Sequence, residues 1–232
     1  LNYAEAHAAG GVALTGTVTR LAEGATFSVS LADGGVTKTY AATVGAGGTW
    51  TATIPVAAAS VLADGTATVS AQVTDSVGNI SATAKHDFTV NETRPVVTIG
   101  TVAGDDVLDY AEAHAAGGVA LTGTVTRLAA GATFSVSVAD GGMTNTYTAT
   151  VGAGGTWSAI MPVAAASVLA EGTATVSAQV TDGVGNISAV AKHDFTVNET
   201  RPIVTIGTVA GDDLLNYAEA HAAGGVALTG TV

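Results

Sequence analysis

The most acidic stretch of the chain carries side chains that could bind a metal ion. Between Gly104 and Glu112 it places carboxylates at Asp105, Asp106, Asp109 and Glu112. Clustered carboxylates repel one another unless something neutralises them, and Ca²⁺ accepts roughly six to eight oxygen ligands in a tolerant geometry. If this stretch forms a short helix, Asp105, Asp109 and Glu112 project from one face. The spacing is therefore compatible with a calcium site.

A plainer interpretation of the same acids stays open. Asp105 or Asp106 could cap the helix, Val107, Leu108 and Ala111 would cover the end of the domain, and the remaining acids would face water. The D-x-[DN]-x-[DN]-G pattern of an EF-hand loop is missing. From spacing alone, the calcium site and the solvated loop are equally supported.

The other reactive side chains do not suggest catalysis. No Ser-His-Asp, paired-acid or phosphate-loop arrangement stands out, and we expect no enzyme. His193 alternates onto one strand face with Phe195 and Val197, which favours a half-buried structural histidine. His114 lies near Glu112 in sequence, but further His or Cys ligands for zinc are missing.

Composition excludes further classes of protein. The chain carries a net charge of −12 with only seven Lys and Arg, whereas phosphate binding needs clustered basic residues. We therefore expect no nucleic-acid partner. No apolar run approaches the roughly 18 residues that span a bilayer. The acidic balance fits a protein that binds cations, and equally one whose charge serves solubility.

The chain repeats itself at an interval of 107 residues, without insertions or deletions. Over one period there are 14 differences, most of them mild. A repeat this long is a domain rather than a supersecondary unit. The 232 residues make two periods plus 18, so we expect them to be part of a longer array. Near-identical domains in series provide length, valency or both.

Residues 95–201 show the pattern of one complete all-β domain. Short alternating segments separated by Gly-rich turns are typical of an immunoglobulin-like sandwich. Trp50 and Trp157 each lie on a predicted inner strand, where they are expected to anchor the core of their repeat. Residues 1–94 form a repeat lacking its first strand, and residues 202–232 the first strands of a third. The seven predicted strands are 96–102, 118–126, 133–138, 146–151, 156–162, 174–180 and 187–197.

The expected topology places alternate loops at opposite poles of each sandwich. The loop between the first two strands then shares a pole with the outgoing linker Asn198–Pro202. The turn Asp182–Asn186 shares the other pole with the incoming linker. In a head-to-tail array, the acidic loop of one repeat therefore faces this turn of the next. Arg201 in the linker could bridge acids of neighbouring repeats.

Several motifs resemble bacterial Ig-like extender repeats of giant BapA-like and RTX-type biofilm adhesins. They are the Pro202-to-Ala220 region, the Gly-Thr-Trp turn at Trp157, and the segment Val180–Asn186. The resemblance implies a type I-secreted protein of the bacterial cell surface, with calcium at the domain junctions. The linker Asn198-Glu199-Thr200 departs from the family, which commonly places Asp before Thr.

The candidate calcium ligands follow from the junction geometry and this resemblance together. Each copy contributes its acidic loop, its Asp-x-x-x-Asn turn and its linker. The candidates are Asp105, Asp106, Asp109, Glu112, Asp182, Asn186, Asn198, Glu199, Glu5, Asp75, Asn79, Asp212, Asp213 and Glu219.

The sequence thus favours a structural extender, stiffened by calcium at its junctions, that supports adhesion and biofilm formation. The alternative is a multivalent module whose repeats each bind a carbohydrate or host protein weakly. Ice binding would need a flat, regular Thr array, which the strand alternation does not provide.

The repeats also predict how two molecules could pair. The first repeat lacks the strand that opens the complete domain, while residues 203–209 carry that strand with no sandwich of their own. Neighbouring repeats of the same chain are the expected partners. Head-to-tail strand exchange between molecules is a second possibility, with Asp212, Asp213 and Glu219 joining the loop of Glu5.

Overall fold

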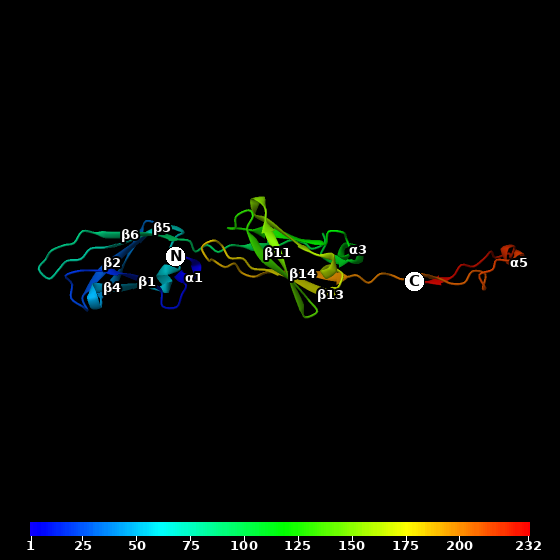
Figure 1. Ribbon diagram of the computed structural model, residues 1–232, viewed down its shortest axis with the longest axis horizontal. Coiled ribbons are helices and arrows are strands. Elements are labelled where there is room, and N and C mark those ends of the chain that lie inside the picture. The colour runs from blue at the N-terminus through cyan, green and yellow to red at the C-terminus, as the bar shows by residue number, and fades with distance from the viewer.

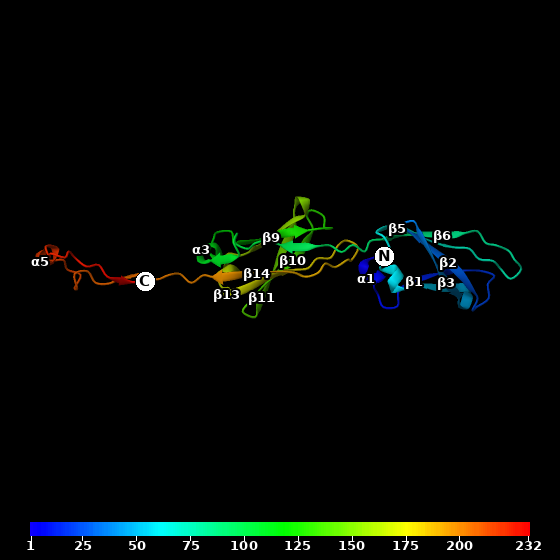
Figure 2. The ribbon, with the colours of Figure 1, turned by 180° about the vertical axis from the view of Figure 1, so that it is seen from behind.

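The computed structural model describes residues 1–232 as three segments that follow one another along a single axis (Figures 1 and 2). Two sandwiches come first, and a thin third segment extends beyond them. Five helices of four residues each cap the ends of strands, and none is long and apolar enough to cross a bilayer. The helices are α1 Tyr3–Ala6, α2 Val56–Ala59, α3 Tyr110–Ala113, α4 Val163–Ala166 and α5 Tyr217–Ala220, with 3₁₀ turns η1 Ala46–Gly48 and η2 Ala153–Gly155.

The second sandwich contains eight strands in the order β7-β9-β12-β11-β10-β13-β14-β8. The sheet curls over, so that β7 at one edge lies against β13 and β14 near the other. This is an immunoglobulin-like arrangement. The first strand, β7, pairs with β9 in one layer, and the chain then continues into β8, which pairs with β14 in the other. The strands are β7 Val97–Ile99, β8 Val107–Asp109, β9 Val119–Val125, β10 Thr133–Asp140, β11 Met143–Val151, β12 Thr156–Met161, β13 Gly172–Ala178 and β14 Ala191–Asn198.

The core of this sandwich is one cluster of 21 buried residues. Trp157 is only 2% exposed, and its ring meets Phe134 edge-on with centroids 5.5 Å apart. Its indole Nε1 donates a hydrogen bond to the Thr98 carbonyl oxygen at 2.9 Å. The prediction that Trp157 anchors the core is confirmed.

The first sandwich has six strands in the order β1-β4-β3-β2-β5-β6. Within the 232 residues nothing occupies the place of β7, so the edge of β1 is unpaired. Nine of its buried residues divide into clusters of six and three. Trp50, also predicted to anchor its core, is only partly buried. The strands are β1 Val12–Thr17, β2 Thr26–Asp33, β3 Val36–Val44, β4 Thr49–Ile54, β5 Gly65–Ala71 and β6 Ala84–Val90.

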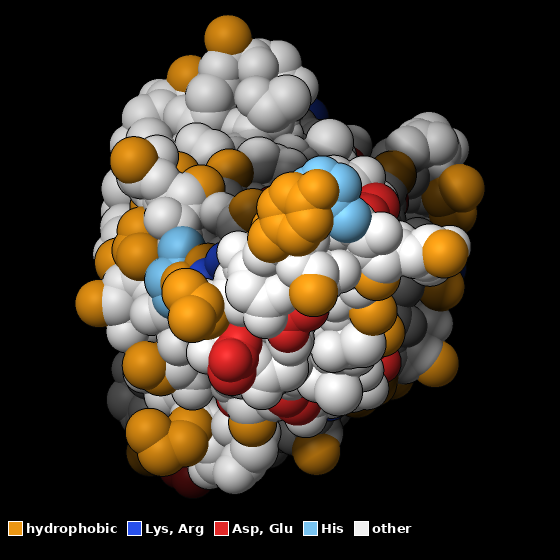
Figure 3. Space-filling model, turned by 90° about the vertical axis from the view of Figure 1, so that its right-hand side faces the viewer, with side chains coloured by type: hydrophobic (Ala, Val, Ile, Leu, Met, Phe, Trp, Pro, Cys, Tyr) orange, Lys and Arg blue, Asp and Glu red, His pale blue; other side chains and the backbone are white.

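The third segment has no core. Its two short strands, β15 Thr205–Ile206 and β16 Gly230–Thr231, pair only with each other. Ile203, Val204 and Ile206 are all largely exposed. Figure 3 views the molecule from this end, where apolar side chains lie at the surface beside acidic and histidine side chains.

Two strand predictions were too long. Only Val97–Ile99 of the expected 96–102 is a strand, because positive φ angles at Ala103, Gly104 and Asp106 turn the chain towards the other layer. The last strand begins at Ala191, since Ile187 forms only an isolated bridge to Thr181.

The acidic loop also differs from the predicted single helix. Val107–Asp109 forms β8, which pairs in parallel with β14, and the helix begins only at Tyr110. Of the apolar residues expected to cover the end of the domain, Leu108 is buried, whereas Val107 and Ala111 are exposed. The neighbouring Ala113 is buried instead.

Candidate functional site

The helix of the acidic loop is held by a reciprocal capping box. Asp109 Oδ1 accepts a hydrogen bond from the Glu112 amide at 2.9 Å, and Glu112 Oε2 accepts one from the Asp109 amide at 3.1 Å. Asp109 is therefore the cap, not Asp105 or Asp106 as expected. The same box recurs with Asn2 and Glu5 and with Asn216 and Glu219. A side-chain oxygen is all this position needs, which explains the exchange of Asp for Asn.

The other two acids of the loop do not join Asp109 and Glu112. Asp105 Oδ1 accepts from the Val107 amide at 3.0 Å. Asp106 Oδ1 accepts from the Val102 amide at 2.8 Å and from His193 Nε2 at 2.7 Å. These hydrogen bonds, the one from His193 foremost, lower the pKa of Asp106. His193 is half-buried, as predicted, and its partner is this carboxylate.

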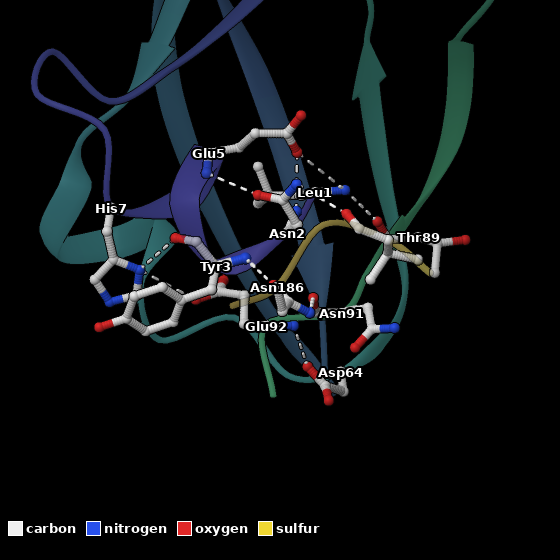
Figure 4. Close-up of polar contacts among 11 residues, drawn as sticks. Leu1, Asn2, Tyr3, Glu5, His7, Asp64, Thr89, Asn91, Glu92 and Asn186 are labelled. Carbon is white, nitrogen blue, oxygen red and sulfur yellow. Dashed lines mark hydrogen bonds and ion pairs between the residues drawn. The ribbon is translucent and has the colours of Figure 1, made fainter. Parts of the chain in front are cut away.

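The Asp182–Asn186 turn is the polar centre of the contact between the first two repeats. Asn186 is 1% exposed. Its Nδ2 lies 3.0 Å from Asp182 Oδ2 and 2.9 Å from the Asn91 carbonyl oxygen in the linker. Its Oδ1 accepts from the Tyr3 amide of the first repeat at 2.7 Å (Figure 4). One side chain thus joins the turn, the linker and the preceding repeat.

Asp182 supports Asn186 from within the turn. Burial opposes ionisation of Asp182, but hydrogen bonds from Asn186 and the Val184 amide outweigh it and lower the pKa of Asp182. In the first repeat, Asp75 and Asn79 make the same contacts inside their turn, at 2.8 and 2.9 Å. That turn is exposed and has no linker against it.

A second hydrogen bond between the repeats runs from Asn2 Nδ2 to the Val184 carbonyl oxygen at 3.0 Å. The loop of one repeat therefore faces the turn of the next, as predicted. The outgoing linker lies beside the loop of its own repeat, because Asn198 is opposite Asp109 in the β14–β8 pairing. Asn91 and Asn2 form the matching bridge.

Two arginines bind across the junction. Arg94 in the linker donates from Nε to the Ile187 carbonyl oxygen and lies over the Tyr3 ring, 5.0 Å from its centroid. Arg127 of the second repeat donates from Nη1 to Asn91 Oδ1 at 2.9 Å. Its Nη2 lies 3.3 Å from Asp64 Oδ2 of the first repeat.

Arg127 and Asp64 were not predicted from the sequence, although the positions of the arginines in the repeat could have indicated Arg127. All four arginines of the chain fall at two positions of the period, as Arg20 and Arg127 and as Arg94 and Arg201. Arg201 lies over Tyr110 at 4.6 Å, repeating the Arg94 contact.

Each linker also buries a glutamate. Glu92 Oε1 and Glu199 Oε1 are enclosed without a hydrogen-bond partner. Burial raises the pKa of both carboxyl groups, although the nearby His7 and His114 act to lower it. His114 Nδ1 lies 3.6 Å from Glu199 Oε2, so its acidic neighbour is Glu199 rather than Glu112.

The structure brings candidate oxygen ligands of two repeats to one junction, but it does not gather three acids around one point. No group of three or more His, Asp or Glu side chains is arranged to hold a metal ion. Most candidate oxygens accept hydrogen bonds from nearby groups, and the buried carboxylate oxygens without a partner belong to Glu92 and Glu199. Asp75 and Asn79 lie in the exposed turn of the first repeat, while Asp212, Asp213 and Glu219 lie in the third segment.

Comparison with known families defines the class of these domains. Residues 14–92 match the bacterial Ig-like domain family. The counterpart of this stretch, 121–199, repeats it nearly residue for residue. The predicted resemblance to bacterial Ig-like repeats and the all-β immunoglobulin-like fold class are both confirmed.

Several solved structures are similar to the chain. One, of a bacterial ice-binding adhesin, is 26% identical with a TM-score of 0.49, over 94% of this chain and 68% of that one. A Ca²⁺-stabilised adhesin of an Antarctic bacterium is 29% identical with a TM-score of 0.48, over 99% and 54%. A tetra-tandem repeat from the extending region of a large adhesion protein is 26% identical with a TM-score of 0.39, over 97% and 59%. No curated protein matches the chain.

Proposed function

We propose that the chain is part of the structural extender of a bacterial cell-surface adhesin. The observation that carries this proposal is the direct junction between repeats, where Asn186, Arg94 and Arg127 join two sandwiches end to end. A linker that is hydrogen-bonded on both sides transmits orientation from one domain to the next. The strands of each repeat then contribute about 23–33 Å of length, for 7–10 residues at about 3.3 Å per residue.

The alternative, a multivalent carbohydrate- or host-protein-binding module, has less support. It needs an exposed aromatic platform, but Trp157 is a core residue and the Tyr147 hydroxyl is buried. Tyr110 is partly exposed, but Arg201 and His114 pack against its ring. The aromatic side chains of the repeat serve its core and its junction.

Calcium at the junctions remains part of the proposal. The donor chemistry fits, since carboxylates, amide oxygens and backbone carbonyls are the ligands that Ca²⁺ accepts, and each linker buries one unpartnered carboxylate oxygen. The candidate ligands that lie at the first junction are Glu5, Asp182 and Asn186, and a bound ion would have to draw them together, since the structure does not gather three acids around one point. A bound ion would neutralise carboxylates in a strongly acidic chain. The family resemblance supports the remaining parts of the proposal. These are type I secretion, a place at the cell surface, and a role in adhesion and biofilm formation.

We further propose that a second molecule can take the place of a neighbouring repeat by head-to-tail strand exchange. The support is an unpaired strand edge in the first repeat and an unpacked matching strand in the third segment.

Spin labels test the extender directly. The chain contains no cysteine, so Val36→Cys with Met143→Cys places labels at equivalent exposed sites in the first two repeats. A rigid junction gives one narrow distance distribution. A broad distribution, with and without calcium, would overturn the extender proposal. If the distance distribution narrows when calcium is added, the result supports calcium at the junction. Equal widths in calcium and in EDTA would contradict the calcium part of the proposal.

A further inference from the structure

The second sandwich is joined to the rest of the chain through its first and last strands. The chain enters through the linker before β7 and leaves through β14. The repeats follow one another along one axis (Figure 1). Tension along that axis therefore enters the sandwich at its first strand and leaves it at its last strand.

The first strand divides between the two layers of the sandwich. β7 is antiparallel to β9 over three residues. β8, in contrast, is parallel to β14. The opposite pairs are Val107 with Thr196, Leu108 with Val197 and Asp109 with Asn198. If tension detaches β7, residues 100–106 straighten and β8 takes the load.

The parallel direction of β8 and β14 decides how this load acts. In a parallel pair, the N-terminal end of one strand and the C-terminal end of the other lie at opposite ends of the pair. Tension pulls these two ends in opposite directions, so the strands must slide past each other lengthwise. Their hydrogen bonds are then loaded together, whereas strands pulled apart from one end separate one residue pair at a time.

The β8–β14 pair is also shielded from water and tied by a side chain. Leu108 is 0% exposed and Val197 is 1% exposed. The Thr196 amide donates a hydrogen bond to the Asp106 carbonyl oxygen at 2.8 Å. Asp106 Oδ1 lies 2.7 Å from Nε2 of His193 on β14. A hydrogen bond that water cannot reach has no substitute partner when it is stretched, so its loss is costly.

The same pairing occurs in the first repeat. The Asn91 amide donates to the Leu1 carbonyl oxygen at 2.9 Å. Asn2 and Asn91 form a parallel bridge, at the positions equivalent to Asp109 and Asn198. Parallel pairing of the first and last strands therefore closes both sandwiches of the chain.

We propose that this parallel pairing, β8 with β14 in the second repeat, is the force-bearing clamp that resists unfolding when the array is pulled from both ends. The inference rests on the proposed extender role, since an extender attached at both ends carries tension. It assigns the mechanical resistance to one pair of strands rather than to the core as a whole.

Single-molecule pulling of the full chain in two directions tests the clamp. The chain has no cysteine, so Thr93→Cys with Thr200→Cys places handles at equivalent exposed linker positions on either side of the second repeat. Force is then applied as the array transmits it. Ala111→Cys with Thr200→Cys places the handles just after β8 and β14, where force peels the two strands apart from one end.

At the same force, unfolding along the array should be at least about tenfold slower than unfolding by peeling, because each additional hydrogen bond that breaks in the barrier slows unfolding several-fold. Equal rates in the two directions would overturn the inference. This comparison needs no substitution in the core.

Two buried leucines provide a matched pair of variants. Leu108 lies in the clamp, whereas Leu121 lies on β9 and is 1% exposed. Either Leu→Ala change removes the same side chain from one core, so both should lower the melting temperature. Only Leu108→Ala should speed unfolding along the array, by at least about tenfold, because the contacts of Leu121 are still intact when the clamp breaks. Equal acceleration by both variants would show that the whole core resists force, and would contradict the clamp.

Failure of the clamp is distinguishable from failure of the extender proposal. Without a clamp, the spin-label distribution between positions 36 and 143 stays as narrow as before, because that measurement applies no force. A broad spin-label distribution would overturn the extender proposal and leave the two unfolding rates of the second repeat unchanged.

Discussion

The backbone amide of Tyr3 donates a hydrogen bond to Asn186 Oδ1 at 2.7 Å, across a separation of 183 residues. Tyr3 opens the loop helix of the first repeat, and Asn186 closes the turn of the second. The contact therefore fixes the end of one sandwich on the next. Because Asn186 also holds the linker at Asn91, rotation about the linker would break both bonds at once.

Asn186→Ala is expected to loosen this junction. Removing a buried side chain that satisfies several polar groups costs about 1–3 kcal/mol, and the spin-label distribution between positions 36 and 143 should broaden. Asn79→Ala is the matched control, because Asn79 makes the same bonds within its turn but none to a linker. Equal broadening by both variants would show that the turn, and not the contact, sets the orientation.

Arg127→Ala should weaken the junction in a salt-dependent manner. Arg127 bonds Asn91 and Asp64 in the first repeat, but both it and Asp64 are about one-third exposed. Its ion pair is therefore worth no more than ~1 kcal/mol. The broadening should be smaller than for Asn186→Ala and should diminish at high salt. Arg20→Ala removes the equivalent arginine of the first repeat and should leave the distance distribution unchanged.

Asp109→Asn should leave the second repeat as stable as before, whereas Asp109→Ala should destabilise it by about 1 kcal/mol through loss of the helix cap. Asn2 and Asn216 already cap the same helix in the other copies. Thermal unfolding measures both effects. The combination of Asp105→Ala with Asp109→Ala should leave the sandwich folded, because both side chains lie outside the core. Complete unfolding of that double variant would show that these acids serve the fold.

Acid should destabilise the second repeat through Asp106. The pKa of Asp106 is lowered in the folded state by its hydrogen bond with His193. Its contribution to stability is therefore present above the ordinary pKa of Asp, about 3.9. It is lost as the pH falls through the lower folded value. His193→Gln should flatten this acid dependence in thermal unfolding, whereas His86→Gln, with no such partner in the monomer, should not.

Glu199→Gln should stabilise the second repeat at neutral pH in EDTA. Burial raises the pKa of Glu199 in the folded state, so its ionised form is unfavourable there. Stability of the parent chain should thus rise as the pH falls through that raised pKa, and the Gln variant should lose this dependence. Glu23→Gln, at an exposed site, is the control. If Glu199→Gln instead lowers the melting temperature in EDTA, the carboxylate has a favourable partner in the folded protein.

The repeat, most of the strands and the poles of each sandwich could be predicted from local sequence patterns. Alternating Val and Thr residues with Gly-rich turns locate the strands of the second sandwich, because strand periodicity is a local property. Their number and the alternation of loops then place Asn198 beside Asp109 and the Asp182 turn beside the incoming linker. The family match over residues 14–92 agrees with the predicted immunoglobulin-like fold.

Only the tertiary structure decided which side chains meet. The sequence predicted a helix from Asp105, but Val107–Asp109 forms a strand, because pairing with β14 supplies backbone hydrogen bonds that local propensity cannot anticipate. The contacts of Asn186 with Tyr3 and of Arg127 with Asp64 join positions 183 and 63 residues apart. They depend on how one sandwich is placed on the next, and no periodicity within a single repeat encodes that placement.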